Sequence, residues 1–176
     1  EDWHVIPARQ THTLAQIEGA GIIRHMWVTI ASDDPMHRRN LVLRMYWDGE
    51  EQPSVETPLG DFFGMGHSMT KNFVSLPLQM SPDNGRAFNC WFPMPFQTGA
   101  RIEIINETSQ SLNFYFYVDY ELYPTGTSMA DYGRFHAQWP EAVRALITDR
   151  LPLEKAPDAL LARGAGIKTV VRLAEL

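Results

Sequence analysis

Cysteine is almost absent from this sequence: Cys90 is the only one in 176 residues. One cysteine excludes an internal disulfide framework and any thiolate-rich metal site. Its neighbours, Phe88-Asn89-Cys90-Trp91-Phe92, are mostly apolar, which favours a buried thiol over a nucleophile. A chain without disulfides suits a reducing cytosol, and because the sequence begins at Glu1 a secreted location stays open.

Long apolar runs and an excess of basic charge are missing as well. No stretch reaches the roughly 18 to 20 apolar residues of a membrane-crossing helix, so we predict no membrane span. Asp and Glu number 21 against 15 Lys and Arg, which gives a net charge of −6. Nucleic-acid binding needs a basic surface, so we expect no nucleic-acid partner. The basic pair Arg38-Arg39 is close to Asp33 and Asp34 and is interpreted as part of a solvated loop.

Metal-ligand and cofactor motifs are absent too. The six histidines show neither the H-x-H nor the H-E-x-x-H spacing, so we predict no metal site. There is no Gly-x-Ser-x-Gly elbow for a catalytic serine. We expect no cofactor.

The sequence does contain several segments with the two-residue period of β-strands. Aromatic and β-branched residues gather at residues 21–31, 41–47, 101–106 and 112–123. In the last segment Phe114, Phe116, Val118 and Tyr120 fall on one face, which predicts that this face lies in the core. Turn-forming residues, among them Asp48-Gly49 and Asn106-Glu107-Thr108-Ser109, and a long irregular region at residues 64–87 separate the strands. The pattern predicts a mainly β protein, an antiparallel β-sandwich.

The C-terminal part of the chain has a different pattern. Apolar residues between Pro140 and Arg150 follow a helical period, which predicts a short amphipathic helix. A further helical turn is expected at residues 157–162 and a closing strand at residues 167–173. We therefore divide the chain into a β-domain, residues 1–139, and a short α/β tail, residues 140–176.

Residues 46–66 combine carboxylates, aromatic rings and glycines as a sugar-binding cleft does. Glycoside hydrolysis normally uses two carboxyl groups on opposite sides of one bond. The candidate catalytic carboxylates are Asp61, Glu56 and Asp48. The candidate ligand contacts are Trp47, Phe62, Phe63 and His67. The alternative is a turn at Asp48 between two strands whose aromatic residues lie in the core, with Asp61 holding the shape of its own loop.

Five phrases in order carry a family resemblance. They are LAQIEGAGIIRHMW (residues 14–27), YWDGEEQPSVE (46–56), PLGDFFG (58–64), WFPMPF (91–96) and FHAQW (135–139). Over residues 13 to about 139 the chain resembles the first half of the family once catalogued as domain of unknown function 2961, now glycoside hydrolase family 172. The resemblance implies a single jelly roll, half of a tandem fold that assembles into trimers and larger oligomers. Characterised members of the family act on fructofuranosyl and arabinofuranosyl linkages.

The resemblance does not extend to the family's catalytic motifs. Motifs of the types Gly-Glu-Gly-Asp and Gly-Thr-Gly-Thr-Glu-Asp-Tyr do not occur in the sequence. Residues 141–173 instead resemble the C-terminal end of medium-chain dehydrogenases, with a Pro-Leu-Glu-x-Ala-Pro segment before an Ile-Lys-x-Val-Val strand. No dehydrogenase activity is implied, because the sequence has no Gly-x-Gly-x-x-Gly turn.

These observations together predict a self-assembling jelly-roll module. We expect a trimer or a larger closed shell of identical chains, derived from a furanosidase-like family without its catalytic half and with weak affinity for furanosyl carbohydrate. Apolar surface bared by the loss of a second domain must be covered by sister copies or by the tail. The alternative is a glycoside hydrolase for fructofuranosyl or arabinofuranosyl linkages, with its site at the subunit interface.

Overall fold

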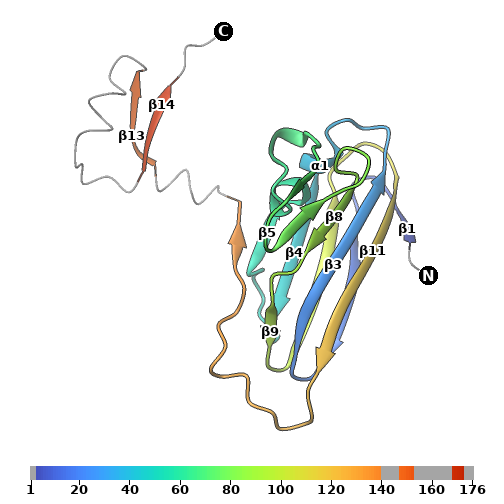
Figure 1. Ribbon diagram of the computed structural model, residues 1–176, viewed down its shortest axis with the longest axis vertical. Helices are drawn as coiled ribbons and strands as arrows, with labels where there is room; N and C mark the ends of the chain where they lie inside the picture. Colours follow the sequence, from blue (N-terminus) through green and yellow to red (C-terminus); the bar gives the residue numbers. More distant parts are fainter. Residues whose placement is uncertain (1–2, 140–146, 153–167, 173–176) are drawn as a thin grey trace. The chain divides into compact units, whose positions relative to one another are not determined.

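A computed structural model describes residues 3–139, 147–152 and 168–172, and the chain divides into two compact units, Glu1–Gln138 and Trp139–Leu176. The first unit is a sandwich of two sheets (Figure 1). Its elements, in chain order, are β1 (Trp3–Ile6), β2 (Thr11–Glu18), β3 (Gly21–Ala31), α1 (His37–Asn40), β4 (Leu41–Trp47), β5 (Val55–Pro58), α2 (Leu59–Phe62), the 3-10 helix η1 (Gly66–Ser68), β6 (Phe73–Val74), β7 (Leu78–Met80), β8 (Ala87–Cys90), β9 (Met94–Phe96), β10 (Gly99–Asn106), β11 (Leu112–Leu122) and β12 (Ala137–Gln138).

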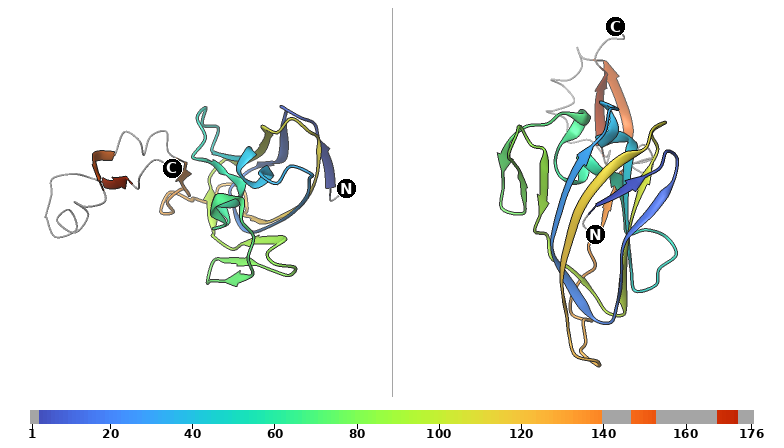
Figure 2. Two further views of the ribbon diagram at one scale, coloured as in Figure 1. Left: turned by 90° about the horizontal axis from the view of Figure 1, so that it is seen from above. Right: turned by 90° about the vertical axis from the view of Figure 1, so that its right-hand side faces the viewer.

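The two sheets differ in size. The larger has seven strands in the order β1-β11-β3-β8-β7-β6, with β9 also paired to β3. The smaller has five strands in the order β12-β5-β4-β10-β2. All pairs within the two sheets are antiparallel except β12 with β5. Figure 2 shows the long strands of both sheets running side by side around one core. The prediction of a mainly β, antiparallel sandwich is therefore confirmed.

The core contains the residues that the strand period places inward. Leu43, Met45, Phe114 and Ile104 are fully buried between the sheets. Tyr120 was predicted on the same face as Phe114, but its side chain is 47% exposed. The register of β11 against β3 shifts between Asp119 and Tyr120. The extra residue at this bulge is Arg24 of β3, so the alternation of β11 itself is unbroken. Tyr120 lies near the end of β11, where residues 119–122 are all exposed, and this corrects the prediction for Tyr120.

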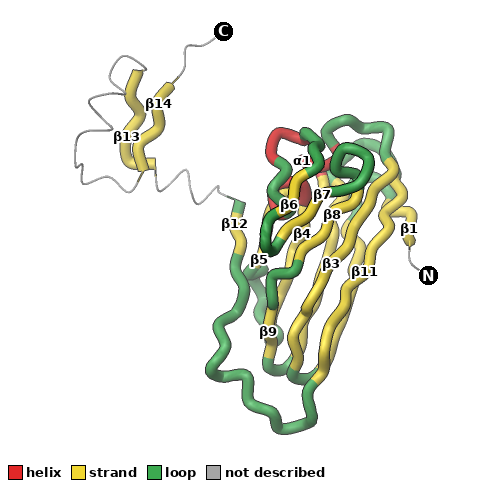
Figure 3. Tube along the Cα trace, in the orientation of Figure 1, coloured by secondary structure: helices red, strands yellow, loops and turns green. Residues whose placement is uncertain are grey.

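The region from residue 64 to 87 is more regular than the sequence predicted. It holds η1, β6 and β7, and β7 pairs with β8 at the side of the larger sheet. Figure 3 shows the short helices gathered with this region at one end of the sandwich. The region predicted to be irregular thus contains two short strands, of two and three residues, between its loops.

The second unit contains two parallel strands, β13 (Ile147–Pro152) and β14 (Lys168–Arg172). β14 lies within the strand predicted at residues 167–173. Residues 147–150 are extended, so the helix predicted to end at Arg150 is wrong for them. The rest of that helix and the helical turn at residues 157–162 lie outside the described residues. Among the described residues, no helix combines the length and apolar character needed to cross a membrane.

Candidate functional site

Two of the three candidate carboxylates, Asp48 and Asp61, lie near opposite ends of β4. Asp48 directly follows Trp47, at the end of β4, whereas α2 with Asp61 follows Pro58, whose partner Val42 is at the start of β4. With a rise of about 3.3 Å per residue, the two ends of β4 are about 20 Å apart. Glycosidase carboxyl pairs are separated by only about 5 to 9.5 Å. Within one chain, Asp48 and Asp61 therefore cannot act on the same bond.

Asp48 links its own turn to two other loops. It starts a tight turn with Gly49, both at positive φ, and the Glu50 N–H donates to the Trp47 carbonyl at 3.0 Å. Its Oδ1 accepts the backbone N–H groups of Gln97 at 2.6 Å and Thr98 at 2.7 Å. Its Oδ2 accepts Arg134 Nε at 2.6 Å. This set of bonds makes Asp48 a joint between the β4–β5 turn, the turn before β10 and the loop that carries Arg134.

The electrostatics of Asp48 follow from these bonds. Partial burial by itself raises the pKa of the carboxyl, but the Thr98 N–H, the Arg134 guanidinium and the Gln97 N–H together outweigh burial and lower the pKa below its ordinary value. Asp48 is therefore ionised at neutral pH. A carboxylate held in this form suits a structural role better than that of a proton donor.

Asp61 lies in α2 and is bound by Arg39 of α1. Arg39 Nη1 donates to both carboxylate oxygens, at 2.7 and 2.8 Å. The Asp61 side chain is only 15% exposed. Asp61 was weighed above as a residue that holds the shape of its own loop. In the structure its carboxylate is bound by the Arg39 side chain. The interpretation of Arg38-Arg39 as a solvated loop is wrong, because both residues lie in α1 and Arg39 forms this ion pair.

Glu56 lies on the outer face of the smaller sheet. It accepts Arg44 Nε at 2.7 Å across the β4–β5 pair. On the next strand Glu103 is paired with Arg44 in the register and forms an ion pair with Arg101, whose guanidinium lies over the Tyr46 ring. Charges of alternating sign therefore cover this face. We call it the charged face.

The aromatic candidates are largely buried. Trp47 is 2% exposed, Phe63 is fully buried and Phe62 is 9% exposed. Trp47 Nε1 donates to the Phe135 carbonyl at 2.8 Å, so even its polar atom is satisfied internally. These rings pack in the core of the single chain and present no open ring face for a sugar to stack on. Their placement agrees with the alternative considered above, in which the aromatic residues belong to the core.

His67 is the candidate that is exposed. It lies in η1, and both His67 and Ser68 have positive φ, near 58° and 57°. Non-glycine residues seldom adopt this conformation. Ser68 Oγ donates to the Pro35 carbonyl at 2.8 Å, which helps to fix the turn. His67 is thus held at the end of the sandwich that carries α1 and α2.

A row of aromatic residues that was not predicted from the sequence lies on the outer face of the larger sheet. We call it the aromatic face, and it consists of Trp3, His25, Trp27, Trp91, Tyr115 and Tyr117. Its rings contact one another in pairs: Trp3 with Tyr115, Trp27 with Tyr117 and His25 with Trp91, with centroids 6.1, 5.4 and 4.9 Å apart. Trp3 and Trp91 are 42% and 41% exposed and Tyr117 is 50% exposed. The two-residue period of β11 already placed Tyr115 and Tyr117 opposite the core face.

A family model described as GH172 domain-like matches residues 1–116, which is most of the first unit. The chain belongs to this family. The resemblance seen in the sequence is thereby confirmed for the N-terminal domain, and GH172 membership relates the chain to glycoside hydrolases. Among curated proteins, none matches the sequence closely enough to serve as a relative. Within the described residues, no three His, Cys, Asp or Glu side chains gather as a metal site would require.

Proposed function

We propose that this GH172-like chain is a self-assembling module whose residues 1–139 form a trimer or a larger closed homo-oligomer. The contrast between the two outer faces of the sandwich carries this proposal. The smaller sheet presents the charged face, which suits contact with water, and the larger sheet presents the aromatic face. Large exposed aromatic patches mark interaction surfaces, and Trp and Tyr are enriched where proteins meet.

A closed ring of three needs two different patches on each chain, because each subunit contacts its neighbours through different surfaces. The second patch is what we call the β6–β7 arm, residues 69–80. Its exposed side chains include Met69, Val74 and Leu76, which are 68%, 74% and 98% exposed. The aromatic face begins at β1, at one edge of the larger sheet, and β6 forms the other edge. This separation allows the arm of one chain to pack on the aromatic face of the next.

Assembly is tested by light scattering coupled to size-exclusion chromatography at micromolar concentration. The wild-type chain is expected to have at least three times the 20.1 kDa mass of one copy. Tyr117→Glu places a charge on the aromatic face, and we expect it to shift the protein to the monomer because burying an unpaired carboxylate is costly. Tyr132→Glu is the matched control, since Tyr132 is 54% exposed and lies outside both patches. A monomeric wild type, or a Tyr117→Glu variant of unchanged mass, would contradict the proposal.

Hydrolysis of furanosyl linkages is the second candidate because the family contains glycoside hydrolases. Against it, Asp48, Glu56 and Asp61 are each bound by an arginine within the chain. We therefore expect the assembled wild type to show no turnover of aryl fructofuranosides or arabinofuranosides. Turnover that falls in Asp61→Asn or Glu56→Gln, but not in the exposed control Asp131→Asn, would instead establish the hydrolase and a site at the subunit interface. Heat released on titration with furanosyl oligosaccharides, without turnover, would establish weak sugar binding.

A further inference from the structure

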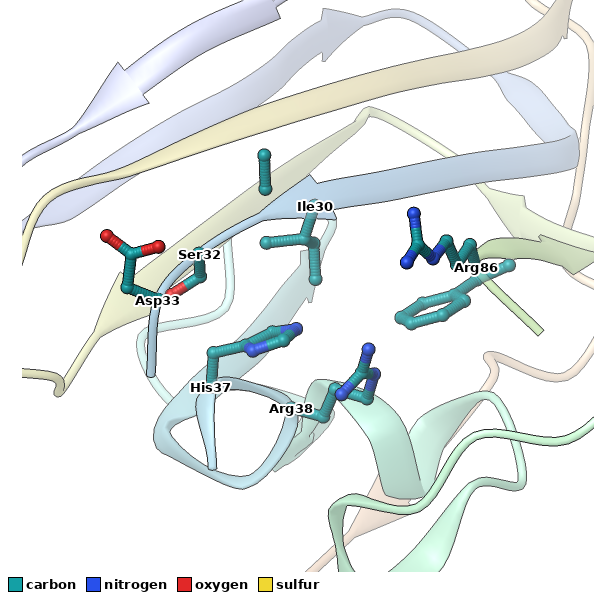
Figure 4. Close-up of a pocket in the computed structure, with 8 residues that line it drawn as sticks. Ile30, Ser32, Asp33, His37, Arg38 and Arg86 are labelled. Atoms are coloured by element: carbon teal, nitrogen blue, oxygen red, sulfur yellow. The ribbon is translucent and has the colours of Figure 1, made fainter. Parts of the chain in front are cut away.

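A pocket of about 330 Å³ opens at the end of the sandwich that carries α1. It is enclosed by the end of β3, the loop that follows it, α1 and the start of β8. Its lining residues are Ile30, Ala31, Ser32, Asp33, His37, Arg38, Arg86 and Phe88 (Figure 4). The volume lies in the range, about 300 to 1,000 Å³, of pockets that bind small molecules. The pocket is thus large enough for a ligand the size of a monosaccharide.

Two buried nitrogen atoms in the pocket residues have no hydrogen-bond partner. They are His37 Nε2 and Arg38 Nε. The His37 side chain is 94% buried and donates its Nδ1 hydrogen to the Asp34 carbonyl at 2.5 Å. With Nδ1 protonated, the neutral ring presents Nε2 as a hydrogen-bond acceptor. Buried polar atoms without a partner are rare in folded proteins, so this acceptor points to a donor supplied by a ligand.

Positive charge gathers on the same pocket. Among the described residues, the Arg38 side chain forms one hydrogen bond, a long one of 3.5 Å from Nη1 to the Ser68 carbonyl. Burial and the nearby charge of Arg86 both lower the pKa of Arg38. Arg38 and Arg86 line the same pocket, and two like charges at close range repel each other. In the part of the chain that the structure describes, neither Arg38 nor Arg86 forms an ion pair. An anion between them would relieve the repulsion and supply acceptors for their N–H groups.

The pocket also has an acidic side. In Figure 4, His37 lies between Arg38 and Asp33, and Arg86 lies on the side of Arg38. Asp33 is exposed. Its carboxylate oxygens and the His37 Nε2 atom all accept hydrogen bonds and do not donate them. A plain anion satisfies the arginines but not these acceptors. A ligand with hydroxyl groups beside its anionic group satisfies both sides.

We propose that this pocket binds a small polyhydroxylated oxyanion. The carboxylate or phosphate of the ligand lies between Arg38 and Arg86, one of its hydroxyl groups donates to His37 Nε2, and a second donates to Asp33. The site involves neither the aromatic face nor the β6–β7 arm, so it does not depend on whether the chain assembles.

Calorimetric titration of the full chain tests the site with four probes: galacturonate, glycerol 3-phosphate, sulfate and galactose. We expect galacturonate or glycerol 3-phosphate to bind, and the tighter of the two identifies the ligand as a carboxylate or a phosphate. Sulfate lacks the hydroxyl groups and is expected to bind more weakly. Galactose lacks the charge and is expected to give no heat. Galactose binding as tightly as both anionic probes, or no binding of either anionic probe, would overturn the proposal.

A charge-matched pair of variants locates the binding. Arg86 is exposed and its side chain is outside the core, so Arg86→Gln should fold normally. It removes one charged donor from the pocket, and we expect affinity for the anionic probe to fall about tenfold or more. Arg9→Gln removes the same charge from an exposed turn that does not line the pocket, and it should leave affinity unchanged. Equal affinity of Arg86→Gln and the wild type, or equal losses in both variants, would place the anion elsewhere and reject the site.

Discussion

Asn106→Asp is expected to lower the free energy of unfolding by about 3 to 5 kcal/mol, although it replaces one nitrogen atom by oxygen. The Asn106 side chain, at the end of β10, is fully buried. Its Nδ2 donates to the carbonyls of Ile6, Pro7 and Gln110 at 3.1, 3.0 and 2.9 Å. Its Oδ1 accepts the Thr108 N–H at 2.9 Å. An aspartate keeps the last bond but turns a buried negative oxygen toward three carbonyl oxygens.

Denaturant unfolding at neutral pH measures the loss, with Asn84→Asp in an exposed turn as the control. The control is expected to change stability by less than about 0.5 kcal/mol. Burial opposite carbonyl oxygens raises the pKa of the new carboxyl in the folded state. The loss should therefore shrink as the pH falls and the carboxyl gains a proton that it can donate. A variant within about 1 kcal/mol of the wild type at neutral pH would contradict the stabilising role of these four Asn106 hydrogen bonds.

The hydrogen bonds of Asn106 illustrate what could and could not be predicted about the fold from the sequence. A turn was predicted at residues 106–109, and the long strands β3, β4, β10 and β11 were predicted because an alternating pattern persists over six residues or more. The hydrogen bond from Asn106 to the Ile6 carbonyl joins positions that are 100 residues apart, which no local sequence pattern reveals. β6, β7, β9 and β12 have only two or three residues each, too few for a period to show. They exist because longer neighbours offer an edge to pair with.

The same limit applies to the candidate site. The sequence showed that residues 46–66 are rich in carboxylates and rings, and it placed the turn at Asp48 correctly. It could not show that Arg134, 86 residues later, binds Asp48, or that Arg39 binds Asp61. Burial of Trp47 and Phe63 likewise depends on the packing of the second sheet. Chemistry-bearing residues were found from composition, but their partners depend on tertiary contacts.

Asp48→Ala carries the other large expected effect, a loss of about 2 to 3 kcal/mol of stability at neutral pH. The change leaves the Gln97 and Thr98 N–H groups and the Arg134 guanidinium without their acceptor. It also places alanine at φ 57°, a conformation that aspartate and asparagine tolerate better. Asp48→Asn keeps one acceptor oxygen and this backbone preference, so we expect it to lose about half as much. Asp131→Asn, at an exposed residue, is the control and should unfold like the wild type.

The dependence on pH separates the structural role of Asp48 from a catalytic one. Because the folded-state pKa of Asp48 is lowered, its contribution to stability is complete above the unfolded-state pKa, about 4, and is lost as the pH falls through the folded value. The stability difference between the wild type and Asp48→Asn should therefore be largest at neutral pH and narrow below pH 4. Denaturant unfolding measures the stability difference between the wild type and Asp48→Asn at pH 7 and at pH 3. Equal differences at the two pH values would show that the ionised carboxylate of Asp48 does not stabilise the fold. A catalytic Asp48 would give the opposite pattern, with furanoside turnover lost in Asp48→Asn while the unfolding curve stays in place.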